Sequence, residues 1–214
     1  DMGTSNISGN VSLTAALITD SGPVSIAGTL TTSGETNLTQ TTASNYSSSG
    51  SQNITQSGNF NSASSTLGGS ITTTDGGNQS FSDAFSLSSA LTLNSSESVT
   101  FAGAITGLNQ ALTISSSGTT TFNNQAIGLS TLTITGATIL NSSAISSAGL
   151  QTYNGPVSLG SDTTLSASTV TLSGNTDGNN ALIISGNANI NAELGNTTAL
   201  KSLQVSGQAN INSS

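Results

Sequence analysis

The fold is decided between Ala111 and Tyr153, where the sequence reads ALTISSSGTTTFNNQAIGLSTLTITGATILNSSAISSAGLQTY. Leu112, Leu132 and Gln151 begin successive units of about 20 residues, and each unit opens with a short strand whose alternate side chains face opposite ways. Two more strand-like triplets lie between consecutive openings. Three short strands in roughly 20 residues make one turn of a parallel β-helix, and such a period indicates a solenoid.

Short strands with a two-residue period recur through the rest of the chain. They include residues 11–13, 24–26, 91–93, 99–101, 157–159, 170–172 and 203–205. Turn-forming Gly, Asn, Asp and Ser residues stand beside these strands, and no segment shows a sustained helical period. We therefore predict an all-β chain that forms a parallel β-helix of ten or so turns. At about 4.8 Å between stacked strands, it would be roughly 50 Å long.

The whole chain, residues 1–214, is predicted to be a single β-helical segment. Nearly constant offsets join Val99, Leu112 and Phe81 to Val170, Leu182 and Tyr153. Offsets that hold so closely predict related multi-turn repeats at 79–150 and 151–214. Apolar residues are sparse between 31 and 70, so we expect irregular turns within residues 1–78. Both ends look like the middle of a repeat, which favours a piece of a longer chain.

The charge balance excludes several classes of function. One of the 214 residues is Lys or Arg, nine are Asp or Glu, and none is His or Cys, which gives a net charge of −8. A nucleic-acid binder needs several cations to neutralise phosphates, whereas Lys201 is the only one here. Disulfides, Cys/His metal centres and His-based catalysis lack their residues. No apolar run approaches the length of about 18 residues that spans a membrane, so we expect no membrane insertion.

The carboxylates are scattered, which argues against catalysis and metal binding. Asp75 and Asp83 are the closest pair in sequence, whereas glycoside hydrolysis needs two carboxylates that face one bond. Asn175, Asp177 and Asn179 alternate, but one carboxylate binds calcium weakly, so a turn with Asx hydrogen bonds is the better interpretation. We therefore predict no catalytic, cofactor-binding or metal-binding residue and no enzyme activity.

Aromatic side chains stand at inward positions of the predicted strands. We expect them to stack within the core and not to form a sugar-binding platform. They are Phe81, Phe85, Phe101, Phe122 and Tyr153.

Outward threonines raise one further possibility. Thr113 and Thr133 are one predicted turn apart, and a flat, regular threonine array would offer a surface to ice. We expect neighbouring turns to break the array with Gln204, Ser158 and Thr171. The main interpretation is a β-branched ladder that supports the sheet.

One stretch of the sequence is similar to a known family. Residues 149–165, which read GLQTYNGPVSLGSDTTL, resemble the repeat of very large bacterial surface exoproteins of the filamentous haemagglutinin type. Residues 99–105 (VTFAGAI) and 118–122 (GTTTF) resemble other parts of that repeat. The resemblance covers roughly residues 79–214, whereas residues 1–78 share only the composition. It implies a right-handed parallel β-helix that is secreted, lies at the bacterial cell surface and acts in adhesion, aggregation or biofilm formation.

The leading functional hypothesis is a structural shaft of a secreted cell-surface adhesin or extracellular filament. The first alternative is a module that binds glycans or cells through a lateral face, and the second is a polysaccharide-processing enzyme. Expected partners are further β-helical turns of a longer chain, a second copy joined end to end, or host or bacterial surface glycans. Nucleic acid is not an expected partner. The expected location is extracellular, at the bacterial surface.

Overall fold

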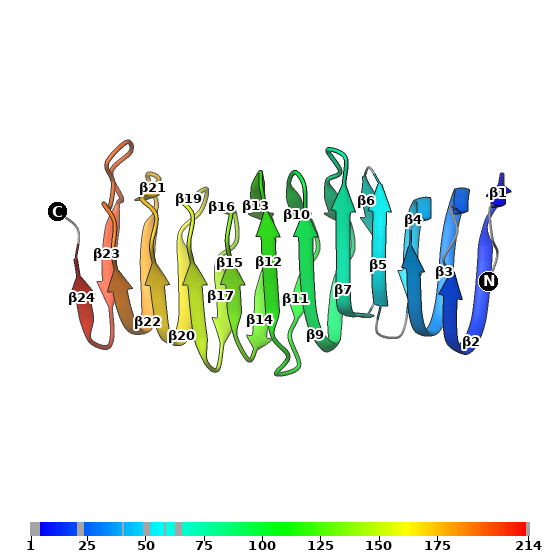
Figure 1. Cartoon of the computed structure of the whole chain (residues 1–214). Coiled ribbons are helices and arrows are strands. Elements are labelled where there is room, and N and C mark those ends of the chain that lie inside the picture. Colours follow the sequence, from blue (N-terminus) through cyan, green and yellow to red (C-terminus); the bar gives the residue numbers. More distant parts are fainter. Residues whose placement is uncertain are drawn as a thin grey trace.

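The computed structural model describes residues 5–20, 24–39, 41–48, 52–57, 59–62 and 66–212. In these residues the chain forms strands joined by turns and loops and no helix, so the described part holds no helix that could cross a membrane. The strands stack from β1 at one end of an elongated body to β24 at the other (Figure 1). Their bounds are β1 Ser5–Ile7, β2 Val11–Asp20, β3 Val24–Thr39, β4 Thr41–Ser48, β5 Gln52–Ser57, β6 Phe60–Ser62, β7 Thr66–Thr74, β8 Gln79–Phe81, β9 Phe85–Ser95, β10 Val99–Phe101, β11 Ile105–Thr106, β12 Leu112–Ser116, β13 Thr119–Phe122, β14 Ala126–Leu129, β15 Leu132–Ile134, β16 Ala137–Leu140, β17 Ala144–Ser147, β18 Leu150–Tyr153, β19 Val157–Leu159, β20 Thr163–Leu172, β21 Thr176–Asp177, β22 Ala181–Ile190, β23 Ser202–Val205 and β24 Ala209–Ile211.

Successive turns of the chain pair in parallel, which gives the body three faces. In its middle, β12, β13 and β14 form one turn and pair with β15, β16 and β17 of the next. We call the faces that contain β12, β13 and β14 face A, face B and face C. Along face A the successive register partners are Ile54, Ile71, Leu93, Ile114, Ile134, Tyr153, Leu172, Ile190 and Ile211.

The predicted parallel β-helix is confirmed. Eight turns separate Ile54 from Ile211, and the pairing of Asp20 with Leu38 and of Leu38 with Ile54 adds two more. Leu112, Leu132 and Gln151, which open the predicted units, lie in register and are each 0 % exposed.

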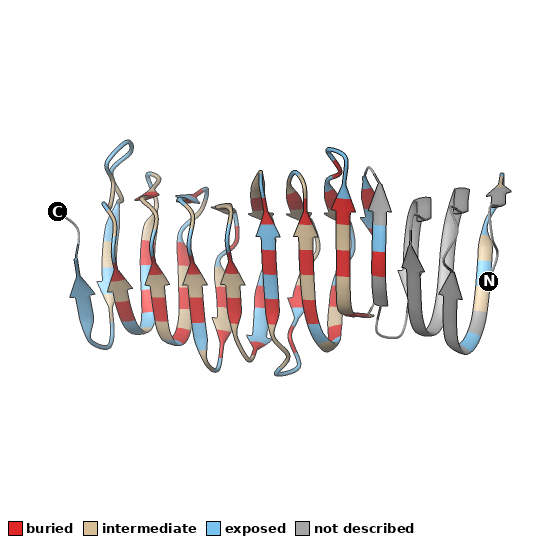
Figure 2. Ribbon diagram, viewed as in Figure 1, coloured by how far each residue is buried: buried red, intermediate tan, exposed pale blue. Residues whose placement is uncertain are grey.

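The core is one apolar column inside the three faces. Buried and exposed residues alternate along most strands that Figure 2 colours, as the two-residue period requires. Phe60, Phe81, Phe101 and Phe122 succeed one another within this column, with ring centroids 6.0, 5.1 and 4.9 Å apart. Tyr153 and Phe85 are buried as well, so the predicted placement of the aromatic residues in the core is confirmed.

Two buried glutamines hydrogen-bond to backbone carbonyls inside the solenoid. Nε2 of Gln151 donates to the carbonyls of Ile145 (3.1 Å) and Ser166 (2.9 Å), and its Oε1 accepts from the Tyr153 hydroxyl (3.1 Å). Nε2 of Gln79 donates in the same way to two carbonyls, at 3.1 and 2.8 Å. These bonds satisfy both amide groups of Gln151 and the Nε2 group of Gln79, which would otherwise be costly to bury, whereas the buried Oε1 of Gln79 has no hydrogen-bond partner.

The parallel ladder continues through the described part of residues 1–78, where irregular turns were expected. Asp20, Leu38, Ile54 and Ile71 are successive partners, although the register shifts locally within the β2–β3 and β3–β4 pairs. The numbers of these partners show that each of these turns is shorter than the turn from Ile71 to Leu93. Shorter turns explain why the period set by Leu112, Leu132 and Gln151 fits this region poorly.

The nearly constant offsets in the sequence do not join equivalent positions of the solenoid. Leu112 lies on face A and Leu182 on face C, while Phe81 lies on face B and Tyr153 on face A. All three faces turn alternate apolar residues inward, so a strand of one face aligns readily with a strand of another. Residues joined by these offsets therefore lie in strands with the same inward apolar pattern, but they are not separated by a whole number of turns.

Candidate functional surfaces

Face A carries a column of outward hydroxyl side chains that is longer than the sequence suggested. We call it the threonine column. Thr171, expected to break the array, continues it, whereas Gln204 pairs with Ile183 and Ser158 with Ile139 on other faces. The expectation of a broken array was wrong because those residues were assigned to the wrong strand neighbours. In register order the column comprises Ser70, Thr92, Thr113, Thr133, Thr152 and Thr171, followed by Asn189 and Asn210.

The strips beside the threonine column are less regular. On β18, Thr152 is flanked by Leu150, which is 53 % exposed, and by the exposed Asn154. Nearer the C-terminal end the amides pair, with Nδ2 of Asn210 donating to Oδ1 of Asn189 at 3.1 Å. From Ser70 to Asn210, face A is thus a neutral hydrogen-bonding strip with a repeat of about 4.8 Å along its axis.

Among the residues whose burial the structure describes, no aromatic side chain is available to stack on a sugar, because all five phenylalanines and Tyr153 lie in the core. A ligand of face A would therefore bind through hydroxyl and amide groups.

The closest pair of acids in sequence does not form a catalytic pair in the structure. Asp75 lies in the turn after β7, and Asp83 follows β8, so the two carboxylates flank opposite ends of β8. Asp75 accepts a hydrogen bond from the Thr74 hydroxyl (3.0 Å). Within the described ranges, no three His, Cys, Asp or Glu residues cluster so that they could hold a metal ion.

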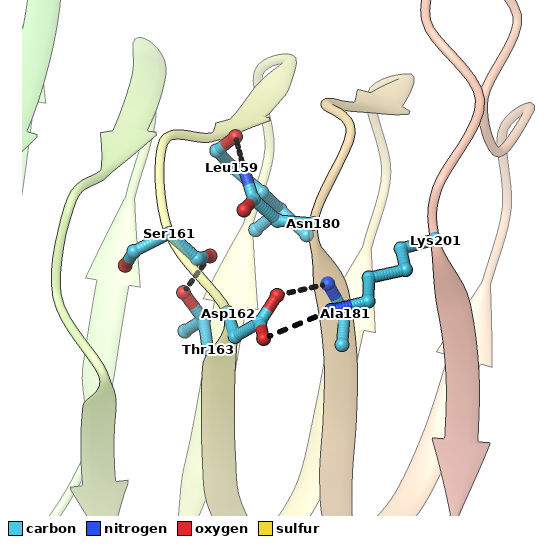
Figure 3. A network of polar contacts seen from close by, with 7 residues as sticks. All are labelled: Leu159, Ser161, Asp162, Thr163, Asn180, Ala181 and Lys201. Carbon is cyan, nitrogen blue, oxygen red and sulfur yellow. Dashed lines mark hydrogen bonds and ion pairs between the residues drawn. The ribbon is translucent and has the colours of Figure 1, made fainter.

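The charge network nearest the C-terminal end runs along the axis of the solenoid (Figure 3). Oδ1 of Asp162, just before β20, accepts the backbone N–H of Ala181 at 2.8 Å, and its Oδ2 lies 3.6 Å from Nζ of Lys201. These three residues belong to successive turns. The Ala181 N–H, aided by Lys201, holds the pKa of the Asp162 carboxyl below its usual range. Both charged side chains are well exposed, so the ion pair itself stabilises little.

Neighbouring polar side chains in this network bind backbone carbonyls. Nδ2 of Asn180 donates to the Leu159 carbonyl at 2.7 Å, and the Thr163 hydroxyl donates to the Ser161 carbonyl at 3.0 Å (Figure 3). The network therefore fastens the corners of adjacent turns. It offers no arrangement of acid and base for proton transfer.

Asp177, in the alternating Asn-Asp-Asn segment, binds the next turn. Its Oδ1 accepts the backbone N–H groups of Thr197 (2.8 Å) and Thr198 (3.2 Å). Asx hydrogen bonding was expected within a single turn, and the structure places these two bonds between turns. A carboxylate used in this way fixes a corner of the solenoid.

The sequence predicted that Thr113 and Thr133 lie one turn apart, but it did not predict the other polar contacts between turns described above. The Asp162–Ala181–Lys201 contact and the full threonine column both depend on which residues become neighbours after a complete turn. Because turn length varies, spacing alone does not reveal them.

Comparison with known proteins finds no matching family model, no matching curated protein and no matching solved structure. Functional interpretation of this chain therefore depends on its geometry and chemistry.

Proposed function

We propose that this chain is a structural shaft of a secreted cell-surface adhesin or extracellular filament. The observation that carries the proposal is the continuous parallel ladder of eight turns from Ile54 to Ile211, closed around one apolar core. Backbone hydrogen bonds between parallel strands run along the axis of such a body. Bending or stretching it would require many of them to break, so the architecture suits a stiff spacer.

The composition suits life outside the cell. The chain has no cysteine to oxidise, and Lys201 is its single site for a protease that cleaves after Lys or Arg. We propose an extracellular location at the bacterial surface, where the shaft would support adhesion, aggregation or biofilm formation. Further β-helical turns of a longer chain are the natural partners of such a segment.

A single-molecule pulling experiment tests the shaft. We expect the solenoid to resist extension and then lengthen in steps of about one turn, because repeat proteins lose neighbouring units in succession. A chain that extends smoothly at low force, like a flexible linker, would contradict the proposal. A Gly/Ser-rich linker of the same length is the control.

The threonine column favours one alternative, a lateral face that binds a glycan. A glycan array probed with the intact chain separates the two functions, because a shaft alone binds no sugar. Binding that is weakened by Thr133→Val and Thr152→Val together would establish the alternative. Matched changes on face C, Thr164→Val and Ser185→Ala, would leave that binding unchanged.

A further inference from the structure

Three large apolar side chains that the described structure leaves exposed gather at one corner of the solenoid. Leu108 is 60 %, Ile127 42 % and Leu150 53 % exposed. They lie on consecutive turns, where the chain passes from face C to face A: Leu108 between β11 and β12, Ile127 on β14 and Leu150 at the start of β18. We call these three residues the apolar corner. It lies well inside the solenoid, because β11 also pairs with β9 on one side and β18 with β20 on the other.

The backbone holds Leu108 in a strained conformation. Its φ is +47° and that of Asn109 is +61°, in the left-handed region that a bulky residue seldom adopts. The N–H groups of Gly107 and Asn109 donate to the carbonyls of Ile127 and Gly128 in the next turn, both at 2.7 Å. The chain is therefore fixed on both sides of an exposed leucine. Backbone strain of this kind concentrates at sites that bind a ligand or partner.

The apolar corner lies within a part of the solenoid that carries no charge. Residues 98–161 contain no Asp, Glu, Lys or Arg, and they span three full turns, from Val99 through its successive partners to Val157. We call them the neutral band, which Glu97 and Asp162 bound. Two copies that each carry a net charge of −8 repel one another, so they come together most easily where both are neutral. The centres of protein interfaces are depleted of charge in the same way.

We propose that two copies of the chain associate side by side through the apolar corner. Leu108 and Leu150 lie one turn to either side of Ile127, so a twofold axis beside Ile127 brings the two corners face to face. The contact uses the same residues of both chains and closes at two molecules. Three large side chains are few for a permanent dimer, so the association is weak and depends on concentration. The inference goes beyond the shaft, which pulling on one molecule tests separately, so either idea can fail without the other.

Sedimentation velocity over a wide range of concentration tests the contact. We expect monomers in exchange with dimers. Leu108→Asn should weaken association by about tenfold or more, because it removes a leucine from the contact, and Leu150→Asn should weaken it as well. Asparagine adopts a left-handed φ more readily than leucine, so Leu108→Asn should keep or raise the wild-type midpoint of unfolding in urea. The matched control is Ile139→Asn, an outward change on face B within the neutral band, which should leave association unchanged.

Salt and cross-linking test the nature and the centre of the contact. Raising sodium chloride from about 10 to about 150 mM shortens the screening length from about 30 to about 8 Å. The two acidic chains then repel each other less, so the dimer should become stronger. The chain has no cysteine of its own, and Ile127→Cys should join two chains by a disulfide under mild oxidation, whereas Ile139→Cys should not.

Three results would overturn the proposal: a wild-type chain that is monomeric at every concentration, equal effects of Leu108→Asn and Ile139→Asn, or a dimer that salt weakens. A monomeric chain that binds phosphatidylcholine vesicles, and loses that binding in Leu108→Asn, would assign the apolar corner to a lipid surface in place of a second copy. Circular dichroism establishes that each variant is folded.

Discussion

Phe101 occupies the middle of the aromatic stack, and replacing it with alanine tests the packing of the core. Its ring lies 5.1 Å from Phe81 and 4.9 Å from Phe122, with interplanar angles of 19° and 26°, and the residue is 0 % exposed. Truncation of a buried phenylalanine costs about 3–5 kcal/mol. The strands around it are fixed at about 4.8 Å by the ladder and can collapse little. We therefore expect a loss near the upper end, about 5 kcal/mol.

The loss of stability caused by Phe101→Ala should be confined to the turns around this residue. The stability of a solenoid is roughly a sum over turns and the contacts between nearest turns, so Phe101→Ala should open the turns that contain β8, β10 and β13. Native-state hydrogen exchange measures this directly, as reduced protection of amides in those strands while β22 keeps its protection. The control is Thr100→Ala, an outward change in the same strand that should alter stability by no more than about 0.5 kcal/mol.

Two results would refute this reasoning. A loss below about 1 kcal/mol would mean that the stack is not tightly packed, because a well-packed core site costs several times more. An equal loss of protection in β22 would mean that the solenoid unfolds as one cooperative unit.

Three further predictions concern single side chains. Tyr153→Phe should lower the free energy of unfolding by about 1–3 kcal/mol at neutral pH, because it leaves the buried Oε1 of Gln151 without its hydrogen bond from the tyrosine hydroxyl. Burial also raises the pKa of Tyr153, so the unfolded chain releases the proton from about pH 10 while the folded chain keeps it. Wild-type stability in urea should therefore fall as pH rises above about 10, and the variant should lack this part of the fall. Gly103→Ala should lower the free energy of unfolding by about 1–3 kcal/mol, because the new methyl group would overlap the backbone of Asp83 and Ala84 in the adjacent turn. Gly9→Ala, which meets open space, should be neutral in the same urea titration. Lys201→Gln should leave the pKa of Asp162 below its ordinary 3.8 in an NMR titration, since the backbone N–H is the larger cause; a return to 3.8 would contradict this assignment.

The three-stranded turn could be predicted because the alternation of apolar and polar residues and the spacing of the strands are both visible in consecutive residues. Leu112 and Leu132 bound a complete turn, and the inward position of each followed from the two-residue period. The same logic placed Phe101 and Phe122 in the core. Local pattern therefore determines which side chains point inward.

Neighbours along the axis were harder to predict, because turns differ in length, as the short turn before Ile54 and the long turn after Ile71 show. A small change in turn length moves a residue to another partner, so the contact of Asp162 with Ala181 did not follow from spacing. The three faces also share one pattern, which made Leu112 and Leu182 look equivalent although they lie on different faces.

The chain advances along the solenoid axis by one strand spacing per turn, whatever the length of that turn in sequence. Spin labels on Ser70 and Asn210, both in the threonine column, are separated by seven turns. Pulsed electron paramagnetic resonance should give a narrow distribution near about 34 Å, from about 4.8 Å per turn. Labels on Thr113 and Asn210, five turns apart, should give about 24 Å. Broad distributions centred well beyond these values, as expected of an unfolded chain, would contradict the solenoid.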